Sequence, residues 1–160
     1  LGGCSTLERK AAVRSSDLSR AQVAGLQSSR YLIATTAGIN NFVDDVNKMN
    51  QAANLLLEVE DFTSFSKVKT QTKTNNCDVT FAYWENIENG IKFTIKANRF
   101  LRNMVRAIVG TCLAVGEGKM EIEEFKQVIE NKNRQSAGTS VPACGLYLKK
   151  VTYPNNAFNV

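Results

Sequence analysis

The sequence predicts an α+β fold in which a mostly antiparallel mixed sheet is flanked by helices. Between residues 77 and 97, two runs of alternating apolar residues flank Asn89-Gly90. Asn-Gly is the strongest short signal for a β-hairpin, because both residues tolerate positive φ. Apolar residues at helical spacing precede and follow this hairpin, so the expected order is helix, strand, strand, long helix, short helix, strand. Helices and an antiparallel sheet packed as two layers form an α+β domain.

Composition limits the chemistry that the chain can perform. Its 160 residues, 43% of them apolar, suit one domain or one domain with an appendage. The absence of histidine excludes Ser-His and Cys-His catalysis and histidine-ligated metals. The four cysteines form no C-x-x-C pair, so we expect free thiols in a reducing compartment and no metal site. The net charge of +5 suits a polyanion such as RNA, and no stretch is long enough to span a bilayer.

Residues 1–43 form an atypical lead segment, rich in Ser, Ala, Gly and Arg and weakly periodic. They predict at most a short helix over 21–26 and a short strand over 31–36. The opening Leu-Gly-Gly-Cys resembles a lipoprotein cleavage box, but neither a charged segment nor an apolar run precedes it. We favour the interpretation that the sequence simply begins there. A start at Leu rather than Met suggests that sequence upstream is missing.

The predicted domain covers residues 44–154 and starts with a helix. Asp44 or Asp45 can cap its N-terminus, and apolar residues at helical spacing follow, so that the helix should end near residue 60. Residues 61–65 then predict a turn, and residues 67–76 predict a basic surface loop. In the hairpin, alternate residues should share one face of each strand: Val79, Phe81 and Tyr83 in the first, and Ile91, Phe93, Ile95 and Ala97 in the second.

The second half of the domain predicts two helices and a strand. A long helix over 98–115, capped by Asn98 and stopped by Gly116 and Gly118, is apolar over more than half its circumference and should be largely buried. A helix over 122–131 and a polar loop over 132–144 lead to a last strand that stops at Pro154, before a tail of residues 155–160. Three strands are too few for a stable sheet. The lead segment, another domain or another subunit should therefore supply more.

Three arginines dominate the long predicted helix. Arg99, Arg102 and Arg106 lie at i, i+3 and i+7, which would place their guanidinium groups on one stripe. The stripe could be a solvated face, but it lacks glutamate partners, and arginine binds phosphate and carboxylate in a two-pronged geometry. Arg106 should lie deepest, with no acidic residue within helical reach. Burying that charge unpaired would cost roughly several kcal/mol, so we expect a carboxylate or phosphate from another element.

The run A-N-R-F-L-R-N-M-V-R-A-I-V-G at residues 97–110 resembles a motif of the TruA family of tRNA pseudouridine synthases. Four further runs match that family in the same order: D-F-T-S-F at 61–65, E-E-F at 123–125, Arg134 with A-G-T at 137–139, and G-L-Y-L at 145–148 before Tyr153-Pro154. Collinear matches over about two-thirds of the chain make a chance resemblance improbable. The matched runs belong to the C-terminal half of the family's pattern.

The resemblance implies a pseudouridine-synthase-like half of an isomerase in tRNA processing. Such enzymes convert uridine to pseudouridine in the anticodon stem-loop of tRNA, without cofactor or metal, as cytoplasmic homodimers. Arg106 would pair with the catalytic aspartate and orient it. Leu146 would pack beneath the flipped uracil, although an ordinary core leucine fits the same pattern. Arg99 and Arg102 would bind tRNA phosphates.

The sequence departs from the family at the aspartate itself. That residue lies in an N-terminal half, in a run like G-R-T-D-x-G-V-H, and no such run occurs here. Asp17 is a weak match to it, and Tyr31 is a weak match to the tyrosine that contacts the base. Three functions therefore stay open: a tRNA pseudouridine synthase completed by an aspartate-bearing half, a non-catalytic RNA-binding module or truncated, inactive gene product, and a surface lipoprotein.

Overall fold

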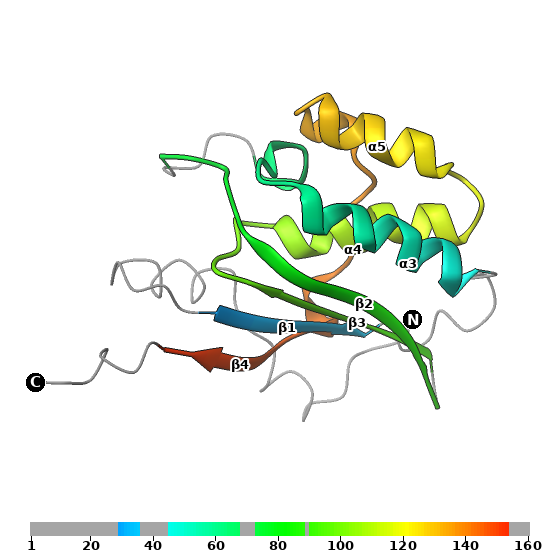
Figure 1. The fold of residues 1–160 in the computed structure, drawn as a ribbon. Helices are drawn as coiled ribbons and strands as arrows, with labels where there is room; N and C mark the ends of the chain where they lie inside the picture. Colours follow the sequence, from blue (N-terminus) through cyan, green and yellow to red (C-terminus); the bar gives the residue numbers. More distant parts are fainter. Residues whose placement is uncertain (1–28, 36–44, 68–72, 89, 154–160) are drawn as a thin grey trace, which may run out of the picture.

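The computed structural model describes the backbone of residues 29–35 and all of residues 45–67, 73–88 and 90–153. This part of the chain forms a four-stranded sheet with the order β2 (Val79–Ile87), β3 (Gly90–Ala97), β1 (Ser29–Thr35) and β4 (Leu146–Thr152). The helices α3 (Val46–Leu55), α4 (Met104–Gly116) and α5 (Ile122–Glu130) all lie on one side of this sheet (Figure 1). Each described strand pair is antiparallel. The predicted α+β class is confirmed.

The strand β1 (Ser29–Thr35) occupies an inner position of the sheet. It pairs with β3 on one side and with β4 on the other. A short strand was predicted close to this position, and the lead segment was one of the expected sources of further strands; both predictions are confirmed. The residues of β1 precede position 44, where the sequence predicts that the domain starts. The predicted helix over 21–26 and Asp17 lie outside the described residues.

The strands β2 (Val79–Ile87) and β3 (Gly90–Ala97) form the predicted hairpin. The alternation on β3 is confirmed, because its predicted inner residues are all buried. On β2, Phe81 and Tyr83 share one face as predicted, but the prediction that Val79 lies on that face is wrong. The pairing register shifts between Val79 and Phe81, so Phe81 and Tyr83 are 43% and 49% exposed, while Val79 and Trp84 are buried. A β-bulge adds one residue to a strand and so reverses which side chains face the core after it.

The helix α3 (Val46–Leu55) begins where the sequence predicts. The Asp45 carboxylate accepts a hydrogen bond from the N–H of Lys48 at 3.0 Å, which satisfies one of the free donors of the first turn. A short 3-10 turn, η1 (Leu56–Glu58), continues the helix almost to the predicted end. Met49, Ala52, Ala53 and Leu56 are fully buried, as their helical spacing predicts.

The predicted turn at 61–65 forms bonds with α5 and with the residues that follow this helix. Asp61 accepts hydrogen bonds from the N–H and the hydroxyl of Thr63, and its carboxylate pairs with Lys132 Nζ at 3.0 Å. The Thr63 hydroxyl is the main cause of a pKa of Asp61 below the ordinary value. The following turn, η2 (Thr63–Phe65), includes Ser64, whose buried Oγ donates to the Val128 carbonyl of α5. The segment thus fixes α5 to the rest of the core.

The helix α4 (Met104–Gly116) begins later than predicted. Its N-cap, Asn103, has φ of 69°, a left-handed conformation that a right-handed helix cannot contain. Asn98 does not cap the helix; its Oδ1 accepts from the N–H of Asp78 at 2.9 Å and holds the end of β3 to the start of β2. Arg99 and Arg102 therefore precede α4, and the predicted stripe of three arginines on one helix is wrong.

The rest of the chain follows the predicted order. α4 ends at Gly116, and Gly118 adopts φ of 68°, as expected of a glycine that stops a helix. α5 (Ile122–Glu130) matches the predicted shorter helix. The predicted loop contains two 3-10 turns, η3 (Arg134–Ser136) and η4 (Ala143–Gly145), and then β4 (Leu146–Thr152) forms one edge of the sheet.

The core lies between the sheet and the helices. α4 contributes most to it, with ten buried residues, in agreement with its apolar circumference. The ring of Trp84 stacks on Phe93 at a centroid distance of 4.7 Å, and the buried thiol of Cys112 belongs to the same core. Within the described residues, no helix combines the length and the apolar character needed to cross a membrane.

Candidate active site at the start of α4

Arg106 lies in the first turn of α4 and is half-buried. Its Nε donates to the carbonyl oxygen of Val141 at 2.6 Å, and the N–H of Val141 donates to the carbonyl oxygen of Arg106 at 3.2 Å. The two residues therefore bond to each other twice, across a separation of 35 positions. Within the described part of the chain, the two terminal nitrogens of Arg106 have no hydrogen-bond partner.

Arg99 and Arg102 lie in the segment between β3 and α4. Arg99 is half-buried; one of its terminal nitrogens donates to the Thr74 carbonyl at 3.3 Å, and its Nε is buried without a partner among the described residues. Arg102 is exposed, and its carbonyl accepts from the N–H of Lys67 at 3.1 Å. All three predicted arginines therefore lie close together along the chain, but they are presented by a turn and a helix start, not by one helical stripe.

None of the arginines with described side chains forms an ion pair with a described carboxylate. The four ion pairs in this part of the chain all use lysine. Arginine nitrogens are instead bonded to neutral acceptors: the Thr74, Ala137, Gly138 and Val141 carbonyls and the Ser140 hydroxyl. A neutral acceptor orients a guanidinium group without cancelling its charge. The start of α4, where the helix dipole is also positive, is thus suited to an anion.

A polar network holds the loop that faces Arg106. One terminal nitrogen of Arg134 donates to the carbonyls of Ala137 and Gly138, at 3.3 and 3.2 Å, and the other donates to Ser140 Oγ at 2.7 Å. Ser140 Oγ also accepts from Asn103 Nδ2 at 2.6 Å. We call Asn103, Arg106, Arg134, Ser140 and Val141 the α4 N-terminal site.

Two glycines allow the loop to approach the helix backbone. A Cβ added at Gly110 would lie 1.8 Å from the carbonyl oxygen of Thr139, and one added at Gly138 would lie 3.0 Å from the Cα of Thr111. The N–H of Gly138 donates to Thr111 Oγ1 at 3.0 Å, and that hydroxyl donates to the Ala107 carbonyl at 2.7 Å. The loop is therefore in direct contact with the second turn of α4.

Leu146 is the first residue of β4 and is buried, with 6% exposure. It belongs to the main hydrophobic core and pairs with Ala34 of β1. A core leucine and a leucine beneath a base share these features, so its role under a flipped uracil stays a prediction. Tyr31 lies in β1, opposite Lys96 of β3 and Lys150 of β4.

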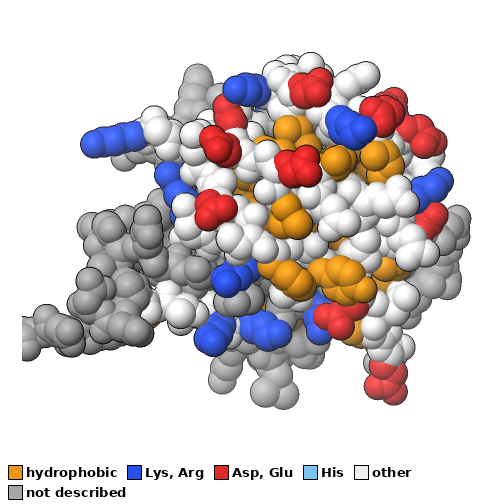
Figure 2. Space-filling model, in the orientation of Figure 1, with side chains coloured by type: hydrophobic (Ala, Val, Ile, Leu, Met, Phe, Trp, Pro, Cys, Tyr) orange, Lys and Arg blue, Asp and Glu red, His pale blue; other side chains and the backbone are white. Residues whose placement is uncertain are grey.

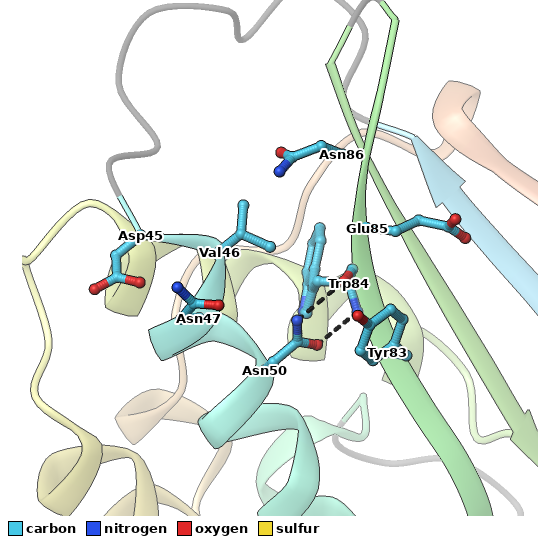
Figure 3. A pocket seen from close by; sticks show the side chains of 8 residues that line it. All are labelled: Asp45, Val46, Asn47, Asn50, Tyr83, Trp84, Glu85 and Asn86. Atoms are coloured by element: carbon cyan, nitrogen blue, oxygen red, sulfur yellow. Dashed lines mark hydrogen bonds between the residues drawn. The ribbon is translucent and has the colours of Figure 1, made fainter.

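A pocket of about 430 Å³ lies elsewhere, between the start of α3 and the edge strand β2 (Figure 3). The amide of Asn50 bonds to the backbone of Trp84 in both directions, at 2.8 and 3.0 Å, and so satisfies polar groups of the sheet edge. α3 begins at the end of the helical layer opposite the start of α4 (Figure 1). The pocket therefore does not include the α4 N-terminal site.

Two of the three described thiols are buried and one is exposed: Cys77 and Cys112 are buried, and Cys144 is exposed. Burial raises the pKa of Cys77 to about 11 and the pKa of Cys112 to about 12. A buried neutral thiol is a poor nucleophile and a poor metal ligand. The described residues contain no group of three Cys, Asp or Glu side chains that could hold a metal ion.

Comparison with known proteins identifies the family. A family profile described as tRNA pseudouridine synthase matches residues 52–154. Curated relatives named tRNA pseudouridine synthase A include that of Parabacteroides distasonis, 53% identical over 116 residues, which are 72% of this chain and 46% of the relative. That of Bacteroides thetaiotaomicron is 52% identical over 118 residues, 72% of this chain and 44% of the relative. That of Bacillus pumilus is 40% identical over 111 residues, 69% of this chain and 45% of the relative.

The chain therefore belongs to the tRNA pseudouridine synthase family, and the predicted resemblance is confirmed. It spans a little under half the length of these relatives. The residues of the α4 N-terminal site all fall within the matched range.

Sequence reasoning found Arg106 but missed the residues around it. Arg134 and Asn103 were noted only as members of matching runs, with no role assigned to them, and Ser140 was not noted at all. Two signals were present. Asn103 is an asparagine, a residue that tolerates the left-handed conformation in which a helix can be preceded by a turn. Gly110 inside a helix indicates either a cost in helix stability or a close backbone contact, and the structure shows the contact.

Proposed function

We propose that this chain supplies the arginine-bearing half of a tRNA pseudouridine synthase active site, and that Arg106 pairs there with the aspartate of an N-terminal half. The observation that carries the proposal is the hydrogen bonding of the Arg106 guanidinium group. Its Nε is held by Val141, and its terminal nitrogens have no partner among the described residues. A half-buried guanidinium of this kind needs an anion, and a carboxylate fits its two-pronged geometry.

The proposed reaction requires no cofactor or metal. The C1′–N1 bond of a uridine breaks, the uracil turns, and C1′ bonds to C5. The hydrogen on C5 leaves as a proton and N1 gains one, so atoms and electrons balance within an isomerisation. The aspartate performs the covalent chemistry, and Arg106 keeps it ionised and oriented. Leu146 packs beneath the uracil, which must first leave its stack at a cost of roughly a few kcal/mol.

The proposed substrate is a uridine in the anticodon stem-loop of tRNA, and the proposed setting is a cytoplasmic homodimer. The net charge of +5 and the arginines without acidic partners support a polyanionic substrate. On the face drawn in Figure 2, one group of Lys and Arg side chains lies at the level of the strands, and others lie over the helices among most of the acidic side chains. Arg99 and Arg102 then bind phosphates beside the target base.

The test measures tritium release from tRNA labelled at C5 of uridine. The chain is combined with the aspartate-bearing N-terminal half of a relative, or the two halves are joined in one polypeptide. Arg106→Ala should lower turnover by roughly 100-fold or more, because the aspartate is left without its charge partner. The Kd for tRNA should change by less than about threefold. Equal losses of turnover and affinity would contradict the proposed role of Arg106.

A second candidate is a non-catalytic RNA-binding module. One observation favours it: the four described ion pairs all use lysine, so the described arginines keep their charge available for phosphates. This function predicts salt-dependent tRNA binding by the chain alone, with no tritium release even when the N-terminal half is present. In either case, Arg102→Ala should make the salt dependence shallower by about one phosphate contact. An unchanged slope would show that Arg102 does not contact the phosphate backbone.

A further inference from the structure

The positively charged guanidinium group of Arg134 donates hydrogen bonds only to neutral acceptors among the described residues. Each of its three hydrogen bonds ends inside the loop 137–140, on two carbonyls and one hydroxyl. Arg134 is half-buried and is the first residue of η3. Helix α5 separates it from α4 and Arg106 in the sequence. We propose that Arg134 is a positioning residue that sets the orientation of the Arg106 guanidinium group through Ser140 and Val141.

The contacts form a short path between the two arginines. Arg134 holds Ser140, and Ser140 precedes Val141, whose carbonyl accepts from Arg106 Nε at 2.6 Å. Asn103, the residue at the start of α4, holds Ser140 from the other side. Ser140 is thus fixed both to the loop and to the helix. Because Nε–H and the two terminal nitrogens share one plane, the Nε–H···O bond limits the directions in which the terminal nitrogens can point.

Hydrogen bonds from Arg134 hold this loop, and Ala137 and Val141 add partly buried apolar contacts with the core. Thr139 and Pro142 are exposed, and Ser140 and Val141 are half-buried. The fully buried core consists of residues outside this loop. Loss of the Arg134 bonds should therefore alter the loop and leave the core in place. This separates an effect on Arg106 from a general loss of the fold.

The first test uses the chain alone and measures hydrogen exchange of the Arg106 Nε–H by NMR. Arg134→Gln should speed that exchange by about tenfold or more, because the Val141 carbonyl is no longer held. Gln135→Ala, at an exposed neighbouring position, and Lys126→Gln, which removes a charge on α5, should change it by less than about twofold. An unchanged exchange rate in Arg134→Gln would overturn the proposal.

Ser140→Ala is the second variant, and it keeps the proposal testable if Arg134→Gln does not fold. It removes one hydroxyl that two donors share. It should likewise speed exchange at Arg106 Nε while leaving the amide exchange of α4 beyond its first turn unchanged. If exchange rises equally throughout α4, the network serves the stability of the helix and the positioning role is wrong.

The catalytic consequence rests on the proposed function and has its own readout. In the completed enzyme, Arg134→Gln should lower kcat by about tenfold to 100-fold, because a misaligned guanidinium misaligns the aspartate, with KM for tRNA nearly unchanged. Arg134→Lys should recover part of kcat, since an ammonium can still donate to two or three of the same acceptors. If the unmodified pair of halves shows no activity, the proposed function fails, while the exchange measurement still decides the role of Arg134. Equal kcat in Arg134→Gln and the unmodified enzyme would refute the catalytic role.

Discussion

Replacing Gly110 with alanine tests the contact between the loop and α4 most directly. A Cβ at this position would lie 1.8 Å from the carbonyl oxygen of Thr139. Real Cβ contacts essentially never fall below 3.0 Å, so the carbonyl must move by about 1.2 Å, the difference between the two distances. The obstacle is backbone, which cannot rotate away as a flexible side chain could. The loop must therefore lift from the helix.

The expected cost follows from the bonds that hold the loop to α4. Three of them end on residues within α4 itself: Gly138 N–H to Thr111 Oγ1, Val141 N–H to the Arg106 carbonyl, and Arg106 Nε to the Val141 carbonyl. At about 1 kcal/mol each, their loss costs about 3 kcal/mol. Alanine is better than glycine in a helix by about 1 kcal/mol. The free energy of unfolding should thus fall by about 2 kcal/mol.

The assay is urea unfolding followed by the fluorescence of Trp84, the only tryptophan, which is fully buried. The urea concentration at the unfolding midpoint should fall by about 1 M, with little change in the m-value, the slope of the unfolding free energy against urea concentration. Gln127→Ala, at an exposed position of α5, is the control and should shift the free energy by less than about 0.5 kcal/mol. A Gly110→Ala variant that is more stable than the parent would refute the reasoning, because helix propensity alone would then decide.

Three other predictions concern the core and the sheet edge. Asn50→Ala should cost about 1–2 kcal/mol and speed the amide exchange of Trp84, since both edge bonds are lost; an unchanged exchange rate would contradict it. Ser64→Ala should cost about 1–2 kcal/mol in urea unfolding, because the buried Val128 carbonyl loses its hydroxyl partner. Burial raises the pKa of Cys112 from 9.0 to about 12, so stability is present below pH 9 and is lost as the pH rises, because the unfolded thiol ionises first. Cys112→Ala should therefore show a smaller loss of unfolding free energy between pH 9 and 11 than the parent, and an equal loss would sink that prediction.

Several elements could be predicted because neighbouring residues decide them. The hairpin depends on Asn89-Gly90, and α3 depends on a cap at Asp45 followed by helical spacing. The need of Arg106 for a partner from another element followed from the absence of acids near it in sequence. These features involve interactions within a few positions of the chain, where propensity, capping and periodicity act.

Other features depend on contacts between distant residues. The bulge that turns Phe81 outward depends on pairing with β3. The late start of α4 depends on Asn98, which bonds to Asp78 rather than to its own helix, and on Asn103, which bonds to Ser140.

The sequence by itself determined the fold class, the order of elements and the family, since apolar periodicity and local motifs specify each of them. Only the tertiary structure decided where β1 pairs, where α4 begins and which groups hold Arg106. Val141 is 35 positions from Arg106, and Ser140 is 37 positions from Asn103. No local preference encodes such a pair, because the two residues meet only after the sheet, the helices and the loop have packed.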